Sequence, residues 1–219
     1  MAYSKETEKR LTDLLQKIEG RKEHEYAAAT YKDVPALKEI VRIVEEQLTQ
    51  DTDESTIVDS IAVLGYVADR YDSLGRFAVS AKIYNQILSL ALKLKQQYDT
   101  DTDGIDGYLY AALQARNFYI DDDCDDLARI ATELMNTVDV ERILGERKER
   151  RRSLKHDSIE MTEEYLAVID EIEEKVEKSR TTYGHGSCFE VWSLKKSYLL
   201  EYDIEWHAPA ELNPRVLFD

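Results

Sequence analysis

Apolar residues recur at intervals of three and four positions along most of the chain. The segments from Leu37 to Leu48 and from Ile57 to Tyr71 repeat apolar side chains at the spacing that places them on one face of an α-helix. A helix that is apolar on two neighbouring faces must pack on both, and the segment from 77 to 94 is predicted to be such a helix. Its two stripes are Phe77, Ala81, Tyr84, Leu88 and Ala91, and Ile83, Ile87, Leu90 and Leu94.

The same spacing predicts further helices, and no segment shows the two-residue alternation of a half-buried strand. The turns between residues 54 and 136 are only a few residues long, which makes consecutive helices antiparallel hairpins. We therefore predict an all-α fold of eight or nine helices whose antiparallel hairpins stack into an α-solenoid, with a closed helical bundle as the alternative. The further helices are predicted at about 105–119, 127–134, 138–156, 159–176 and 188–201.

Composition agrees with long helices and limits the classes of partner. The chain has only 3 Pro and 8 Gly against 34% charged residues, whereas frequent turns would need more of both. The formal net charge of -16 disfavours nucleic acids and anionic membranes and favours basic or neutral partners. No run reaches the roughly 18 apolar residues that span a bilayer, and the start MAYSKETEKR lacks the apolar core of a secretion signal. Cys124 and Cys188 give no disulfide framework, so we predict a cytoplasmic protein.

The stretch VADRYDSLGRFAVSAKIYNQILSLAL carries glycine, small and aromatic residues at characteristic offsets: Gly75 and Phe77 at the turn, Ser80 and Ala81 at the start of the second helix, then Tyr84, Leu88 and Leu90. In these residues it resembles a tetratricopeptide repeat (TPR), and the resemblance extends over about 54–136, with a weaker echo in YAALQARNFYIDDDCDDLARIATEL. Stacked hairpins present a continuous surface on which a peptide or a partner helix can bind. Residues of the first helix of each hairpin would line that surface, and the candidates are Tyr66, Arg70, Tyr108 and Gln114.

The glycine-broken loop TTYGHGS suggests a boundary between a hairpin array at 1–183 and a C-terminal module at 184–219. The module has a helix with a lysine pair at Lys195 and Lys196, then I-x-W, a proline and a terminal N-P-x-x-x-F-D. It resembles a short module that ends uncharacterised bacterial proteins, and no activity comes with the resemblance.

Prolines prevent this ending from continuing as a helix, yet it is too apolar to stay unpacked. We expect it to pack on its own helix or to cap the end of the hairpin stack. The alternative is a recognition segment that docks into another copy or another protein. The anchoring residues would be Trp192, Tyr198, Trp206, Pro209, Pro214 and Phe218.

Two other constellations offer alternative functions. A basic block is a candidate phosphate or nucleic-acid site, although it also suits the negative end of a helix. It consists of Arg147, Lys148, Arg150, Arg151, Arg152 and Lys155. His185, Cys188 and His207 are candidates for a metal-dependent activity, but a structural zinc site needs four ligands and this spacing is no known pattern.

The loop DTDTDGIDG opens like a calcium-binding loop, but Tyr110 stands where a bidentate acid is required. We therefore predict no metal and no cofactor. The prediction that combines these points is a protein-interaction or scaffold module that binds a protein or peptide without catalysis; its homo-oligomeric state is left open.

Overall fold

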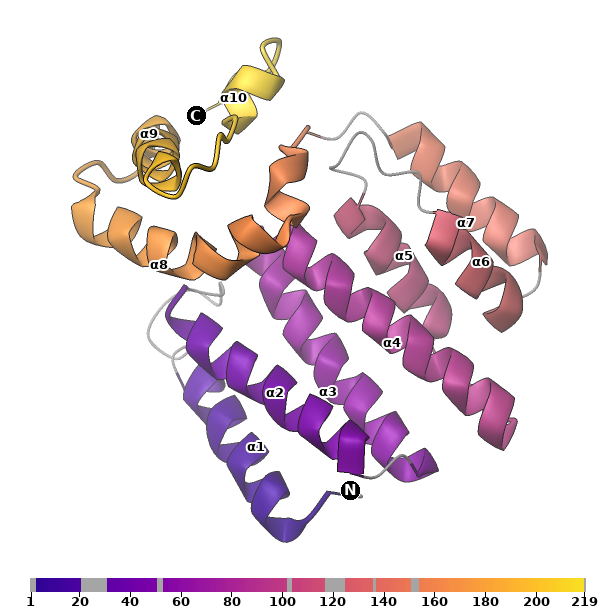
Figure 1. Ribbon diagram of the computed structural model, residues 1–219. Helices are drawn as coiled ribbons and strands as arrows, with labels where there is room; N and C mark the ends of the chain where they lie inside the picture. The colour runs from indigo at the N-terminus through magenta and orange to yellow at the C-terminus, as the bar shows by residue number, and fades with distance from the viewer. Residues whose placement is uncertain are drawn as a thin grey trace. The chain divides into compact units, whose positions relative to one another are not determined.

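The structure is a computed structural model that describes residues 3–20, 31–50, 53–101, 104–116, 125–135, 137–150 and 154–218. Within these ranges every regular element is a helix and no strand occurs, which confirms the predicted all-α class (Figure 1). The elements are α1 (Lys5–Glu19), η1 (Tyr31–Asp33), α2 (Val34–Gln50), α3 (Glu54–Ser73), α4 (Phe77–Tyr98), α5 (Ile105–Arg116), α6 (Asp125–Leu134), α7 (Thr137–Arg150), η2 (Ser158–Met161), α8 (Glu163–Ser179), α9 (Ser187–Leu200) and α10 (Pro209–Leu212).

The chain forms two compact units. The first consists of Met1–Arg116 with Cys124–Glu149, and the second of Asn117–Asp123 with Arg150–Asp219. The loop at 181–186, where the sequence suggested a module boundary, lies within the second unit and joins α8 to α9.

In the first unit, consecutive helices run in alternating directions and pack side by side from α1 to α5 (Figure 1). Helix α3 begins where the Asp53 side chain accepts a hydrogen bond from the backbone N–H of Thr56 at 2.7 Å. The turn into α4 is possible because Gly75 adopts a φ of 70°, a left-handed conformation that other residues rarely adopt. These local signals produce the α3–α4 hairpin at the centre of the unit.

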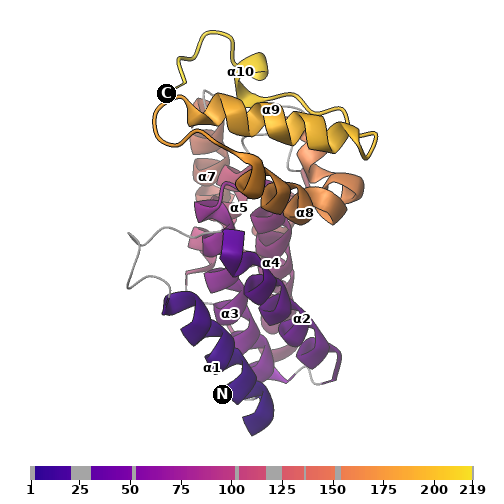
Figure 2. The ribbon, with the colours of Figure 1, turned by 90° about the vertical axis from the view of Figure 1, so that its left-hand side faces the viewer.

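Contacts across the unit arrange its helices in two layers. The hydroxyl groups of Tyr3, just before α1, and Ser60 of α3 lie 2.8 Å apart, and the Tyr66 hydroxyl of α3 donates to Glu19 of α1 at 2.5 Å. Tyr108 of α5 lies directly over Gly65 of α3. Helices α1, α3 and α5 therefore form one layer, while α2, α4 and α6 form the other; Figure 2 shows α1 and α3 on one side and α2 and α4 on the other.

Helix α4 is packed on two faces, as its two apolar stripes predicted. Both stripes contribute buried residues, among them Ala81, Tyr84 and Leu88 on one face and Ile87 and Leu94 on the other. The helix contacts α3, α5 and α6. It is the central helix of the first unit's core.

In the second unit, α8 packs against α9, and the tail covers the pair. The core contains Tyr165, Ile169, Ile172 and Val176 of α8, Leu199 of α9, and Ile204, Trp206 and Ala208 of the tail. The predicted helix at 159–176 is divided in the structure, because Thr162 ends η2 and caps α8 by accepting a hydrogen bond from the Tyr165 N–H. The predicted irregular tail contains one helical turn, α10, so the described residues hold ten α-helices where eight or nine were predicted.

The predicted helix at 138–156 was too long at its C-terminal end. Helix α7 ends at Arg150, and the backbone from Leu154 to Asp157 is not helical. The backbone N–H and C=O of Lys155 are both bonded to the side chain of Asn213, so they are unavailable to a helix.

Candidate binding surfaces

A groove of about 270 Å³ lies between α2 and α4 in the first unit. Each of the two helices presents residues at i, i+3, i+4 and i+7, which is one helical stripe about two turns long. Helix α3 contributes Tyr71, whose side chain lies at the base of the groove. The lining residues are Lys38, Val41, Arg42 and Glu45 on α2, Val79, Lys82, Ile83 and Gln86 on α4, and Tyr71 on α3.

The base of this groove is apolar and firmly packed. Tyr71 is 2% exposed and Ile83 is buried, while Val41 and Val79 are half-buried and belong to the shell around the main core. An apolar side chain of a partner would therefore displace water from a rigid surface, and the side chains of the groove would not need to move. The groove is a preformed apolar contact site.

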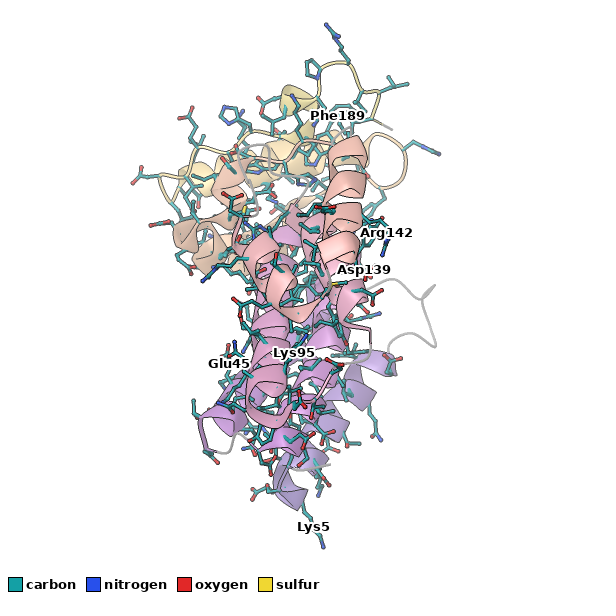
Figure 3. The ribbon with its side chains drawn as sticks, turned by 90° about the vertical axis from the view of Figure 1, so that its right-hand side faces the viewer. Lys5, Glu45, Lys95, Asp139, Arg142 and Phe189 are labelled. Carbon is teal, nitrogen blue, oxygen red and sulfur yellow. The ribbon has the colours of Figure 1, made fainter. Side chains whose placement is uncertain are left out.

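The rims of the groove carry charged residues of both signs. Lys38 and Arg42 line it from α2 and Lys82 from α4. Glu45, which Figure 3 labels, is the one acidic residue of the lining. Arg42 also pairs with Glu39 at 2.9 Å and with Glu46, which offsets part of its charge. Glu39, Glu45 and Glu46 thus equal Lys38, Arg42 and Lys82 in number.

The four residues that the sequence suggested for partner binding do not line this groove. Tyr66 is half-buried and bonded to Glu19, and burial raises its pKa. Arg70 is buried and pairs with Asp33 of η1 at 3.4 Å. These two side chains join parts of the first unit to one another.

The other two suggested residues, Tyr108 and Gln114, lie on α5. Tyr108 is half-buried against Gly65, and burial together with the charge of Asp69 raises its pKa. Gln114 is exposed. The groove was not predicted because the binding surface was assigned to the first helix of each hairpin, whereas α2 and α4 line the groove. The signal for it in the sequence was the stripe of apolar and charged residues on each of these two helices.

A second hollow, a cleft of about 660 Å³, lies where α4, α5, α6 and α7 end or begin. Figure 3 shows Lys95 on α4 and Asp139 and Arg142 on α7 among its lining residues. The Lys95 ammonium group donates to the Leu134 carbonyl at 2.9 Å, so it caps the end of α6. The other charged residues of its lining are Asp101, Asp106, Asp139 and Arg142, so acidic residues predominate there.

The tail is anchored in the second unit through a buried carboxylate. The indole N–H of Trp206, which is 1% exposed, donates to Glu160 at 2.8 Å. The Lys195 ammonium lies 4.7 Å from the Trp206 ring centre and 5.4 Å from that of Tyr165. Burial alone would raise the pKa of Glu160, but the bond from His156, the charge of Lys195 and the Trp206 N–H together lower it.

Two further contacts hold the tail to the segment that precedes α8. His207 donates its backbone N–H to Asp157 at 2.7 Å, and its ring Nδ1 lies 2.9 Å from the same carboxylate oxygen. The side-chain amide of Asn213 bonds both backbone groups of Lys155, and we call this pair of hydrogen bonds the Asn213 clasp. Oδ1 accepts from the Lys155 N–H at 2.8 Å, and Nδ2 donates to the Lys155 carbonyl at 2.9 Å. The tail thus lies against its own unit.

The remaining suggested anchors contribute unequally. Trp192 and Phe218 meet edge to face with ring centres 5.0 Å apart, and Tyr198 shares a hydrogen bond with Ser179 at 2.8 Å. Pro209 begins α10, whereas Pro214 is exposed. Pro214 therefore ends the helical turn without packing into the core.

The loop between α8 and α9 is fixed by Glu190. Its carboxylate accepts the backbone N–H groups of Thr181 at 2.9 Å and Thr182 at 2.6 Å and the Thr181 hydroxyl at 2.7 Å. Hydrogen bonds from Thr181 and Thr182 lower the pKa of Glu190 to about 2.

This pKa predicts an acid-sensitive loop. Because the folded pKa is depressed below the ordinary 4.5, the stabilisation is complete above that pH and is lost as the pH falls from about 4.5 to about 2. We expect the Glu190 carboxyl carbon to titrate near pH 2 by NMR, and Glu190→Gln to remove this titration and to raise hydrogen exchange at Thr181 and Thr182. A titration near pH 4.5 would show that the carboxylate does not hold the loop.

The basic block lies largely outside the described residues. Arg151 and Arg152 are not described, and neither are the side chains of Arg147, Lys148 and Arg150. Lys155 is exposed, with its backbone held by Asn213. In the described ranges, no three His, Cys, Asp or Glu side chains form a group that could hold a metal ion, and His207 of the suggested metal set instead pairs with Asp157.

No protein-family model matches this chain, and neither a curated protein nor a solved structure does. Among the helices described, none combines the length and the apolar character needed to cross a membrane.

Proposed function

We propose that this protein is an interaction module that binds a helix of a partner protein in the groove between α2 and α4. The matched stripes on the two helices carry this proposal. A partner helix lying between α2 and α4 would present apolar side chains at i, i+3 or i+4, and i+7. Val41, Val79 and Ile83 at the base of the groove would contact these side chains.

The two-layer arrangement supports the proposal. In a stack of hairpins each hairpin contacts its neighbours, and the outer faces of the layers stay available to partners. The links from α1 to α3 and from α3 to α5 follow this pattern, and the second of them lies within the segment 54–136 that we propose to be TPR-like. Binding without catalysis, by a protein located in the cytoplasm, is the function we infer.

Photo-crosslinking from inside the groove tests this function. With benzoylphenylalanine in place of Gln86, we expect one predominant crosslinked partner in cells of the native host, because the side chain at 86 lines the groove. With the same group in place of Val58, an exposed residue of α3 outside the groove, we expect no such product.

A second substitution shows whether the product depends on the apolar base. Val79→Glu places a charge where the partner's apolar side chains would lie, so the crosslink at position 86 should disappear while circular dichroism stays helical. Val58→Glu adds the same charge at a control position and should leave the crosslink intact. Equal crosslinking from positions 86 and 58, or a product that survives Val79→Glu in folded protein, would refute binding in this groove.

A further inference from the structure

Two carboxyl groups and a phenol meet where α3 ends and α4 begins. The Tyr84 hydroxyl of α4 lies 2.8 Å from Asp69 Oδ1 and 3.0 Å from Asp72 Oδ2, both on α3. The Ser80 hydroxyl, also on α4, bonds the other carboxyl oxygen of Asp72. Tyr84 and Ser80 are buried and Asp72 is half-buried, so the two hydroxyl groups bond to these carboxyl oxygens and not to bulk water.

The Tyr84 hydroxyl has too few protons for its two contacts. A phenol carries one proton, yet the Tyr84 oxygen lies within hydrogen-bonding distance of two carboxyl oxygens. If Asp69 and Asp72 are both ionised, one of these contacts has no proton between its oxygen atoms. A proton on Asp72 Oδ2 completes the set, because Asp72 then donates to Tyr84 and Tyr84 donates to Asp69. The Ser80 hydroxyl still donates to Asp72 Oδ1.

Among the described residues, no cation balances the two carboxyl groups. Neither Asp69 nor Asp72 forms an ion pair there, and Arg76, the basic residue of the turn between α3 and α4, pairs with neither. From α4 only the hydroxyls of Ser80 and Tyr84 face them, and from α5 the phenol of Tyr108 lies near Asp69. Two adjacent carboxylates without a cation repel each other, and a proton on one of them removes this repulsion.

The ionisation of both groups agrees with this arrangement. Burial raises the pKa of Asp72, the hydrogen bonds from Ser80 and Tyr84 oppose this, and the charge of Asp69 raises the pKa further. Burial and the two carboxylates also raise the pKa of the Tyr84 hydroxyl, so the phenol keeps its own proton. The additional proton therefore belongs to Asp72.

We propose that Asp72 holds a proton which it shares with Asp69 through the Tyr84 hydroxyl, and that this shared proton is a pH-sensitive switch of the α3–α4 hairpin. The proton joins the two helices by an unbroken chain of hydrogen bonds, and its loss leaves two carboxylates competing for one phenol. Tyr71, beside Asp72, and Ile83, beside Tyr84, line the groove, so the switch acts on helices that support the groove. It operates whether or not the groove binds a partner.

The first unit should become less stable as the shared proton is lost. Because the folded pKa of Asp72 is raised above the ordinary 3.8, the stabilisation is complete below that pH and is lost as the pH rises through the folded pKa. Asp72→Asn mimics the protonated carboxyl, since its amide donates to Tyr84 and its oxygen accepts from Ser80. Denaturant unfolding of the full-length protein, followed by circular dichroism at a series of pH values, compares the two proteins.

Relative to Asp72→Asn, the original protein should unfold more readily as the pH rises above 3.8. The unfolding equilibrium constant should increase about tenfold for each pH unit until the folded pKa of Asp72 is reached. Asp13→Asn makes the same change in net charge at an exposed position of α1 and should keep the pH dependence of the original protein. Identical pH profiles for Asp72→Asn and Asp13→Asn would overturn the proposal.

NMR of the carboxyl carbons tests the shared proton directly in the original protein. We expect Asp72 to titrate at a higher pH than the ordinary 3.8. Asp69→Asn should lower that pH, because an amide at position 69 donates to the Tyr84 oxygen and leaves the phenol proton for Asp72. A titration of Asp72 at or below 3.8, or one that Asp69→Asn leaves unchanged, would show that no proton is shared.

Discussion

Replacing Trp206 with alanine is expected to destabilise the second unit by about 3–5 kcal/mol, the usual cost of truncating a buried aromatic side chain. Trp206 is buried beside Ile204 and Ala208 of the tail and satisfies one oxygen of the buried Glu160. Removing it leaves both a cavity and a partly unpaired carboxylate. Hydrogen exchange is the appropriate measurement, because it reports the amides of α8 and α9 separately from those of α3 and α4.

The protein contains a matched control for this substitution. Trp192, the other tryptophan, is half-buried and contacts the rings of Phe189 and Phe218. Trp192→Ala should therefore cost only about 1 kcal/mol, because it loses edge-to-face ring contacts and little burial. If the two variants change the protection of α8 and α9 equally, Trp206 is not the main anchor of the tail.

A second large effect is expected at Gly65, where a side chain would disturb the layer formed by α1, α3 and α5. A Cβ atom on Gly65 would lie 2.6 Å from the Tyr108 hydroxyl and 2.9 Å from a ring carbon. Gly65→Val should therefore destabilise the first unit by about 1–3 kcal/mol, as overpacking does, although valine has the higher helix propensity. Denaturant unfolding followed by circular dichroism measures the change.

Gly145 provides the comparison, since it is also helical but, among the described residues, no atom outside its own stretch of helix lies within 4 Å of the position where a Cβ would lie. Gly145→Val should be neutral or slightly stabilising, because only helix propensity changes. Adding Tyr108→Ala to Gly65→Val should recover part of the loss, so the pair should be non-additive. Additive costs would mean that Tyr108 does not pack over Gly65.

The helices were predictable because their apolar stripes follow the helical period over many residues, as in α3 and α4. Their ends were less predictable where distant groups decide them. The 138–156 helix was predicted too long because nothing local indicates that Asn213, 58 residues away, binds the backbone of Lys155. The predicted 159–176 helix likewise contains a break at Thr162, a polar residue that can either continue a helix or cap one.

The candidate site was harder to predict than the fold. Tyrosine and arginine on a first helix suggested a binding surface, but Arg70 is buried against Asp33, a residue 37 positions earlier in the chain. Residue type cannot distinguish an exposed arginine from a buried, paired one. The groove is formed from two helices separated by α3, so its two stripes become one surface only when the hairpins stack.

The Asn213 clasp has a consequence for how the second unit comes apart. It joins residues 58 positions apart, so the segment that contains α8 and α9 is held together by hydrogen bonds near its two ends. Asn213 of the tail bonds the backbone of Lys155, and Asp157 accepts the backbone N–H of His207, so separating the tail from the stretch before α8 breaks backbone hydrogen bonds of both segments. Proteolytic cleavage in the exposed stretch at 181–185 should therefore leave two fragments that stay bound to each other. They should separate only when the second unit unfolds.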